Sequence, residues 1–186
     1  GLPPPEPLGP DLQAVFDTVS PAVEPVIAAM VAEILALRPR ILGLSSTFQQ
    51  NMVCSAIAWR VKAMAPDICI VLGGANAAWP LCLGVSRAFP WIDHVFAGES
   101  DIDFPDFCEA LIRDGVAPRE RVIRSEPIRD MRVVAAPDFA DYFAMLRPLQ
   151  AAGALPDALP RYITAESSRG CWWGAKSHCT FCGLNG

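Results

Sequence analysis

Residues 40–45 (RILGLS), 68–74 (ICIVLGG) and 92–98 (IDHVFAG) are short apolar runs that each end in small residues. Runs of this length and composition are typical of strands that are buried on both faces of a sheet. Helical patterns lie between and after them, at 51–64, 77–89 and 104–113. Strands that alternate with helices predict βαβ units and a parallel sheet with right-handed crossovers. We therefore expect an α/β fold with a Rossmann-like sheet.

The segments around these runs suggest the domain limits. Residues 1–10 are proline-rich, which predicts an irregular linker over 1–19. Ser20-Pro21 has the residues of a helix start, so we expect a helix from there to Leu37 and an α/β domain over 20–136. Short edge strands are possible at 121–124 and 131–134. Residues 137–161 resemble a linker or partly helical connector, and 162–186 begin with a predicted strand. Both ends look cut, so we expect a part of a longer protein.

The composition restricts the function classes. Of 186 residues, 52% are apolar and 19% are charged, which is typical of a globular core. The net charge of −5 argues against a nucleic-acid partner. No uninterrupted apolar run reaches the roughly 18 residues that span a bilayer, so no membrane association is expected.

The seven cysteines fall into two groups. Cys54, Cys69, Cys82 and Cys108 are scattered through apolar stretches and are expected to be small buried residues. An odd number without a framework spacing argues against a disulfide scaffold, so we expect a reducing, cytoplasmic setting.

The predicted strands lead into loops at 45–51, 73–76 and 98–101. Ligands of open α/β sheets bind beyond the carboxyl ends of the strands, and small residues let backbone amides approach them. The candidate binding residues are Ser45, Ser46, Thr47, Phe48, Gln49, Gly73, Gly74, Ala75, Asn76, Gly98, Glu99 and Ser100. Tight βα turns also need small residues, so a purely structural role stays open. No loop has the G-x-G-x-x-G or P-loop pattern of a dinucleotide or triphosphate site.

The C-terminal residues contain a C-x7-C-x2-C spacing. The candidate metal ligands are Cys171, Cys179 and Cys182. Three thiolates would leave one iron of a [4Fe–4S] cluster open to bind a small molecule. A zinc site completed by His178 is the alternative. The aromatic neighbours suit a cofactor pocket better than a small zinc site; they are Trp172, Trp173 and Phe181.

Residues 166–186 (ESSRGCWWGAKSHCTFCGLNG) resemble the cluster loop of the cobalamin-dependent radical S-adenosylmethionine (SAM) enzymes that mature ribosomally made peptides (RiPPs). Radical SAM enzymes usually have C-x3-C-x2-C, and the longer first gap is similar to that of a subgroup. The stretches 46–51, 71–76 and 93–99 resemble the cobalamin-binding domain of this family, so the resemblance covers about residues 38–186.

The resemblance implies a flavodoxin-like cobalamin-binding domain, followed by the first strand and cluster loop of a radical SAM barrel at 162–186. Cys171, Cys179 and Cys182 would hold a [4Fe–4S] cluster whose open iron chelates S-adenosyl-L-methionine, with Phe181 near the adenine. Cobalamin would lie over the three loops. The implied activity is C-methylation of a precursor peptide through a 5′-deoxyadenosyl radical. The implied partners are that peptide and an electron donor such as flavodoxin or ferredoxin.

Several features depart from the family pattern. The D-x-H-x-x-G motif of many cobalamin proteins is missing, so no histidine is assigned as lower cobalt ligand. Residues 98–101 read GESD where GEGE is common, and the first strand and helix of a complete domain are not found before residue 20. Two other interpretations stay open. One is a non-catalytic Rossmann-like binding module with a zinc or redox-sensing cysteine tail, and the other is radical chemistry that rearranges the substrate without methylation.

Two further residues are singled out by their positions. His94 lies in a predicted buried strand and is expected to be a packed core histidine. Glu99, at a strand end, is equally compatible with a functional role and with a solvated turn carboxylate.

Overall fold

The computed structural model describes residues 9–155, 163, 166 and 169–177. The chain divides into two compact units, residues 1–129 and 130–186, which are described separately.

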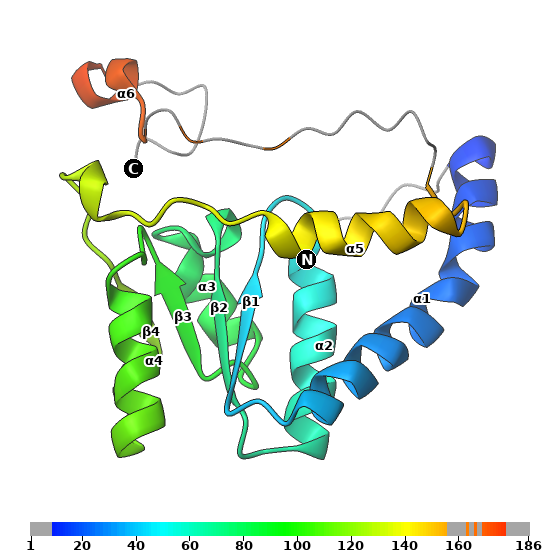
Figure 1. Ribbon diagram of the computed structural model, residues 1–186, viewed down its shortest axis with the longest axis horizontal. Helices are drawn as coiled ribbons and strands as arrows, with labels where there is room; N and C mark the ends of the chain where they lie inside the picture. The colour runs from blue at the N-terminus through cyan, green and yellow to red at the C-terminus, as the bar shows by residue number, and fades with distance from the viewer. Residues whose placement is uncertain (1–8, 156–162, 164–165, 167–168, 178–186) are drawn as a thin grey trace, which may run out of the picture. The chain divides into compact units, whose positions relative to one another are not determined.

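The first unit is built on four parallel strands, β1 (Ile41–Ser45), β2 (Cys69–Gly73), β3 (His94–Ala97) and β4 (Val122–Arg124). They lie side by side in the order β1-β2-β3-β4 (Figure 1). Ile41 pairs with Cys69 and Ser45 pairs with Gly73, so β1 and β2 end together. The expected α/β class with a parallel, Rossmann-like sheet is confirmed, as is the edge strand at 122–124.

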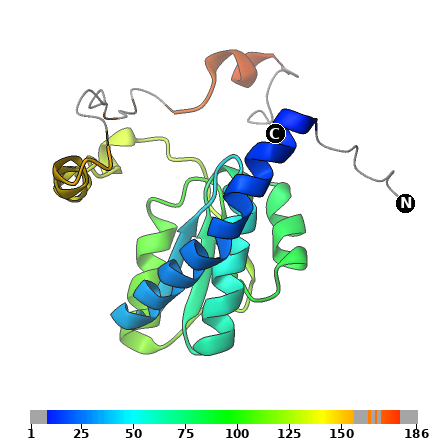
Figure 2. The same ribbon diagram turned by 90° about the vertical axis from the view of Figure 1, so that its right-hand side faces the viewer.

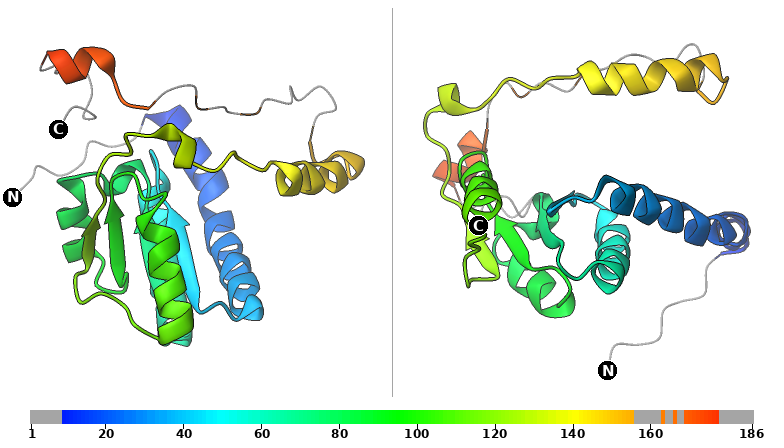
Figure 3. Two further views of the ribbon diagram at one scale, coloured as in Figure 1. Left: turned by 60° about the vertical axis from the view of Figure 1, so that its left-hand side comes forward. Right: turned by 60° about the horizontal axis from the view of Figure 1, so that its bottom comes forward.

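Helices cover both faces of this sheet (Figures 2 and 3). On one face, α2 (Gln50–Met64) and α3 (Leu81–Ala88) pack over Ile70, Leu72 and Val95, each at most 1% exposed. On the other face, α4 (Asp103–Asp114) places Phe107 against Val71 and Phe96. Because successive side chains of a strand point to opposite faces, each strand contributes to both cores.

The crossover from β3 to β4 has the opposite hand to the one before it. Both connections step in the same direction across the sheet, but α3 and α4 lie on opposite faces. The expectation of right-handed crossovers throughout is therefore wrong. Edge-to-face ring contacts hold α4 in place, since Phe96 lies 5.5 Å from Phe104 and 5.4 Å from Phe107 between ring centroids.

The first helix, α1 (Pro10–Leu37), starts ten residues before the expected position at Ser20. Residues 10–19 are therefore helical and not a linker. Pro10 suits the first helical turn, where its missing N–H is not needed. The helix continues through Pro21 and Pro25 and ends at Arg38 in a left-handed conformation with φ 48°.

α1 packs against α2 through its C-terminal half, where Ile27 and Val31 are buried and Glu24 pairs with Arg60. Among the described residues, α1 is also the one helix whose length and composition would allow it to cross a membrane.

The 77–89 segment divides into two pieces. A 3-10 turn, η1 (Ala75–Ala77), comes first, and α3 begins only at Leu81. The expected helix start at Ala77 is wrong because Pro80, which follows a cis Trp79–Pro80 bond, interrupts the segment.

The second unit contains η2 (Met131–Val133), α5 (Ala140–Ala151) and the short α6 (Trp172–Lys176). The possible edge strand at 131–134 is instead a 3-10 turn, in which the Asp130 carboxylate accepts a hydrogen bond from the Arg132 N–H at 3.1 Å. Most of the strand expected from Tyr162 lies outside the described residues.

Candidate functional site

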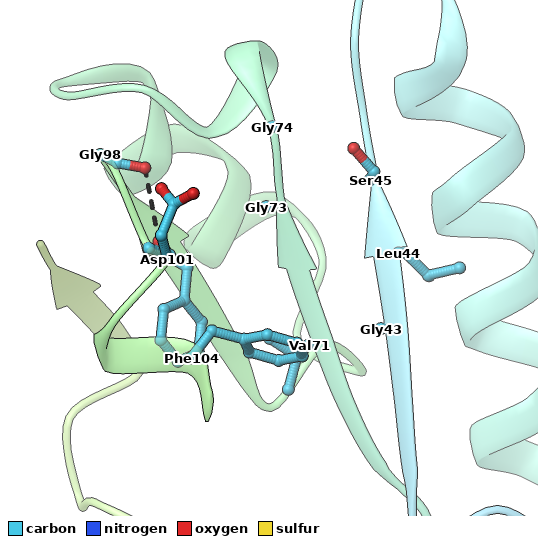
Figure 4. Close-up of a pocket in the computed structure, with 11 residues that line it drawn as sticks. Gly43, Leu44, Ser45, Val71, Gly73, Gly74, Gly98, Asp101 and Phe104 are labelled. Atoms are coloured by element: carbon cyan, nitrogen blue, oxygen red, sulfur yellow. Dashed lines mark hydrogen bonds between the residues drawn. The ribbon is translucent and has the colours of Figure 1, made fainter. Parts of the chain in front are cut away.

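A hollow of about 470 Å³ opens at the carboxyl edge of the sheet, on the face that carries α4 (Figure 4). It is lined by Gly43, Leu44, Ser45, Val71, Gly73, Gly74, Phe96, Gly98, Ser100, Asp101 and Phe104. Its size lies within the range of small-molecule sites.

The hollow lies where two neighbouring loops leave the sheet in opposite directions. The loop after β2 runs to η1 and α3 on one face, and the loop after β3 runs to α4 on the other. In open α/β sheets this divergence creates the crevice in which ligands bind. The change of face at β3 therefore provides the crevice, although the strand order itself does not reverse among β1–β4.

The floor of the hollow is almost free of side chains. Gly43 and Ser45 of β1 lie on the same face as their neighbours Val71 and Gly73 of β2, because their positions in the paired register match. A Cβ at Gly43 would lie 3.6 Å from the Phe104 ring, which forms one wall. This surface suits a flat or extended group, with the Ser45 hydroxyl and the Asp101 carboxylate among its polar lining.

The first two loops are locked together by Ser46, which is fully buried. Its N–H donates to the Gly73 carbonyl at 2.9 Å, and its carbonyl accepts from the Asn76 N–H at 3.0 Å. Its hydroxyl donates to Asn51 Oδ1 at 2.7 Å and accepts from Asn76 Nδ2 at 2.9 Å. Each polar group of Ser46 thus has a partner, and the loops after β1 and β2 form one rigid edge.

Gly74 makes this contact possible. It has φ 93°, and a Cβ there would lie 2.6 Å from the Ser46 carbonyl oxygen. Only glycine meets both the steric and the conformational requirement.

The tip of the first loop presents Phe48 to solvent. Thr47 donates to Gln50 Oε1 from both its N–H and its hydroxyl, at 2.8 and 2.9 Å, and Asn76 Nδ2 donates to the Phe48 carbonyl at 2.9 Å. Phe48 itself has φ 47° and is 88% exposed. A large apolar side chain held in a left-handed conformation without burial is unusual and suggests a contact surface.

The third loop is fixed to the segment after β4. Gly98 has φ 118°, and a Cβ there would lie 2.6 Å from the Ser125 carbonyl oxygen. The Ser100 and Ser125 hydroxyls are 3.2 Å apart. The Glu99 carboxylate accepts from the Ile128 N–H at 2.9 Å. The structure thus shows neither of the two roles open for Glu99, but a carboxylate that binds the backbone of Ile128.

In the second unit, Cys171 is an exposed free thiol. It follows Gly170, which has φ 83°, and its Sγ accepts a hydrogen bond from the Gly174 N–H at 3.3 Å. Lys176 Nζ lies 4.3 Å from the centre of the Trp172 ring. The described residues contain no group of three His, Cys, Asp or Glu side chains that could hold a metal ion. Cys179, Cys182, His178 and Phe181 lie outside the described residues.

The candidate binding residues have different positions in the structure. Five line the hollow: Ser45, Gly73, Gly74, Gly98 and Ser100. Ser46, Thr47 and Asn76 hold the loops together, Ala75 opens η1, and Phe48 and Gln49 are exposed at the loop tip.

Asp101 lies in the predicted loop 98–101 but is not among the candidate residues. The loop-based prediction missed the other lining residues, which are Gly43, Leu44, Val71, Phe96 and Phe104. The period of two along each strand could have placed Gly43 and Val71 on the face of Ser45 and Gly73. No comparable pattern in the sequence predicted where α4 lies relative to the strands.

Other predicted positions are clear. His94 is a core residue, with Nδ1 3.0 Å from the Glu120 carbonyl and its ring against Phe107. Cys54 and Cys82 are buried as expected, whereas Cys69 and Cys108 are half-buried.

Searches against protein-family models, curated proteins and solved structures found no match. Any functional conclusion therefore depends on the motifs and on the geometry of the hollow.

We predict that Gly74→Ala lowers the free energy of unfolding by roughly 2 kcal/mol or more, because the new Cβ meets the Ser46 backbone and φ stays positive. Gly84→Ala is the matched control: Gly84 lies within α3 with nothing near its Cβ position, so the variant should gain up to about 1 kcal/mol. Urea unfolding followed by circular dichroism measures both. Equal stability of the two variants would contradict the proposed lock between the loops.

We also predict selective alkylation of metal-free protein. Burial, with the Asp93 carboxylate as a smaller cause, raises the pKa of Cys69 to about 11. At pH 8 its thiolate fraction is therefore only on the order of 0.1%. Exposed Cys171 should react with iodoacetamide at least about tenfold faster. Peptide mass spectrometry at increasing pH measures both rates, and the Cys69 rate should rise steeply toward pH 11. Similar rates at pH 8 would mean that the thiol of Cys69 is not shielded.

Proposed function

We propose that this chain is the N-terminal part of a cobalamin-dependent radical SAM enzyme that C-methylates a ribosomally made precursor peptide. In this proposal the first unit binds cobalamin. Cys171, Cys179 and Cys182 bind a [4Fe–4S] cluster that takes S-adenosyl-L-methionine. The hollow at the carboxyl edge of β1–β3 is the observation that supports the proposal most.

The residues of the hollow fit part of an elongated cofactor. Gly43 and Gly73 leave room for close approach to the backbone, and Val71 and Phe96 add apolar side chains to the lining. Ser45 and Ser100 line the hollow, and the Ser45 hydroxyl can bind polar atoms of a sugar or base. About 470 Å³ is enough for a nucleotide-sized group, with the rest of the ligand over the loops. Bound cobalamin would supply a transferable methyl group, which no protein side chain provides.

The role of the protein in this site is to hold the loops rigid. Ser46 and Asn76 fix the edge before any ligand arrives, so little ordering is needed on binding. Phe48, exposed at the tip of the loop, offers an aromatic face to a bound ring system.

No histidine among the described residues is suited to bind cobalt. His94 stands at the start of β3, is 6% exposed and is held at the Glu120 carbonyl. This agrees with the missing D-x-H-x-x-G motif and supports a mode of binding without a histidine ligand from this part of the chain.

Cys171 is suited to bind a metal because its thiol is exposed and free. An exposed thiol is equally suited to zinc, so the binding module with a zinc tail is the second candidate. The two differ in the metal that purified protein contains.

We predict that filling the hollow weakens cobalamin binding. Ser45→Trp should weaken the binding of hydroxocobalamin by the full chain at least about tenfold, because the indole would occupy the space over Gly43 and Gly73. Ala88→Trp is the matched control, since Ala88 is exposed at the C-terminal end of α3, away from the hollow. Equilibrium dialysis with absorbance detection gives both affinities. The same affinity for both variants would exclude the hollow as the site, and no binding by the wild-type chain would contradict the cobalamin proposal.

We predict separately that replacing Cys171, Cys179 and Cys182 by Ala abolishes iron binding but leaves the α/β unit folded. The protein is reconstituted anaerobically with iron and sulfide, and iron content, electron paramagnetic resonance with and without S-adenosyl-L-methionine, and circular dichroism are recorded. A signal that shifts with S-adenosyl-L-methionine supports the open-iron cluster. A colourless wild-type chain with one zinc ion would favour the binding module.

A further inference from the structure

α1 has two apolar faces, of which the structure uses one. Ile27 and Val31 pack against α2, with Ile34 and Leu35 at the margin of the same core. The other face is in solvent along most of the helix. Its exposed residues, 41–57% accessible, are Leu12, Phe16, Val19, Val23, Val26 and Met30. The N-terminal half of α1 extends beyond α2 (Figure 1).

The exposed face has the spacing of a helix–helix seam. Its six residues are separated by four, three, four, three and four positions. Repeats of this kind, averaging 3.5 residues, place apolar side chains in one line that packs against another helix. An isolated α-helix in water gains no stability from this regular spacing, because the apolar side chains are buried only when a partner covers them.

The borders of this seam carry no charge. On one side lie Val15, Ala22, Ala29 and Ala36, and on the other lie Gln13, Ser20 and Ile27. The small alanines allow a second helix to approach closely, and no charge lies in the seam or beside it between Leu12 and Met30; Glu33, at the next position of the repeat, ends the seam. Pro21 and Pro25 lie off the seam, so neither interrupts its line of side chains.

We propose that the seam of α1 is covered by the same seam of a second copy of this chain. A self-complementary patch of this kind is what a two-fold symmetric dimer needs. Two seams of this length, each about half exposed, would remove on the order of 1,000 Å² from water, which reaches the size expected of a specific interface. The inference does not depend on the proposed function.

A lipid surface fits the seam less well. The charged residues of α1 are all acidic, at Asp11, Asp17, Glu24 and Glu33, whereas helices that lie on membranes are rich in Lys and Arg. A membrane span would also require α1 to give up its contacts with α2 and the Glu24–Arg60 pair.

The proposal is tested by sedimentation of the full wild-type chain and of two variants at about 5–100 µM, which is about 5–100 times a dissociation constant of 1 µM. The wild-type chain should sediment as a dimer, and Val19→Glu/Val23→Glu should shift it to a monomer, with at least about a 100-fold weaker association. Ile112→Glu is the control, because Ile112 on α4 is as exposed as Val19, at 54%, and lies outside the seam. Circular dichroism checks that all three are folded.

A charge-rescue experiment separates pairing from a defect in folding. Val19→Glu/Val23→Glu and Val19→Lys/Val23→Lys should each be monomeric alone and should form a heterodimer when mixed, because Glu faces Lys in either helix orientation. A wild-type chain that is monomeric at 100 µM, or one that floats with lipid vesicles as a monomer, would overturn the proposal. A dimer that survives the Glu substitutions would also overturn it.

Discussion

The buried Ser46 is the contact on which the functional edge depends. Four hydrogen bonds join it to Gly73, Asn76 and Asn51, so two loops from different strands behave as one piece. Such a polar group is stabilising only when every partner is present, because an unpaired buried hydroxyl or amide costs about 1–3 kcal/mol. The positive φ of Gly74 is part of the same arrangement, since any side chain would separate the two backbones. The rigidity of the edge therefore comes from a small residue, a buried hydroxyl and an amide, and not from apolar packing.

A second constraint turns this edge into a hollow. Phe96 projects from β3 on the face opposite to α3, and the rings of Phe104 and Phe107 cover it. The connection after β3 must follow α4 to that face, away from the connection after β2. The space between the diverging loops stays open because Gly43 and Gly73 have no side chains to fill it. The aromatic cluster thus determines where a ligand can enter, although only part of it touches the hollow.

The strands could be predicted because their signal is local. Runs such as 68–72 are apolar throughout and bounded by turn residues, so their type follows from composition alone. The start of α1 could not be found in this way, because Ser20-Pro21 looks like a helix start although the preceding residues from Pro10 are already helical. The prolines there are tolerated since no residue of 10–26 is buried and solvent can bind the freed carbonyls.

The hand of the crossover from β3 to β4 could not be predicted from the sequence. It depends on which face of β3 carries the larger aromatic rings in the folded chain. The same holds for the candidate site. The loops after β1, β2 and β3 were predicted as the binding edge, but Phe104 joins it only through the fold of α4.

The exposed seam of α1 differs from the edge of the sheet formed by the loops after β1 and β2 in whether its groups have partners. At the edge, each polar group of Ser46 has a partner within the chain, so a ligand would meet loops whose positions are already fixed. On α1, Val19 and Val23 have no packing partner in the described residues. A helix that only had to cover α2 would not need apolar side chains at regular spacing on its other face. A regular apolar line on the solvent side is therefore a property of an interface, because neither helix formation nor the packing of Ile27 and Val31 requires it.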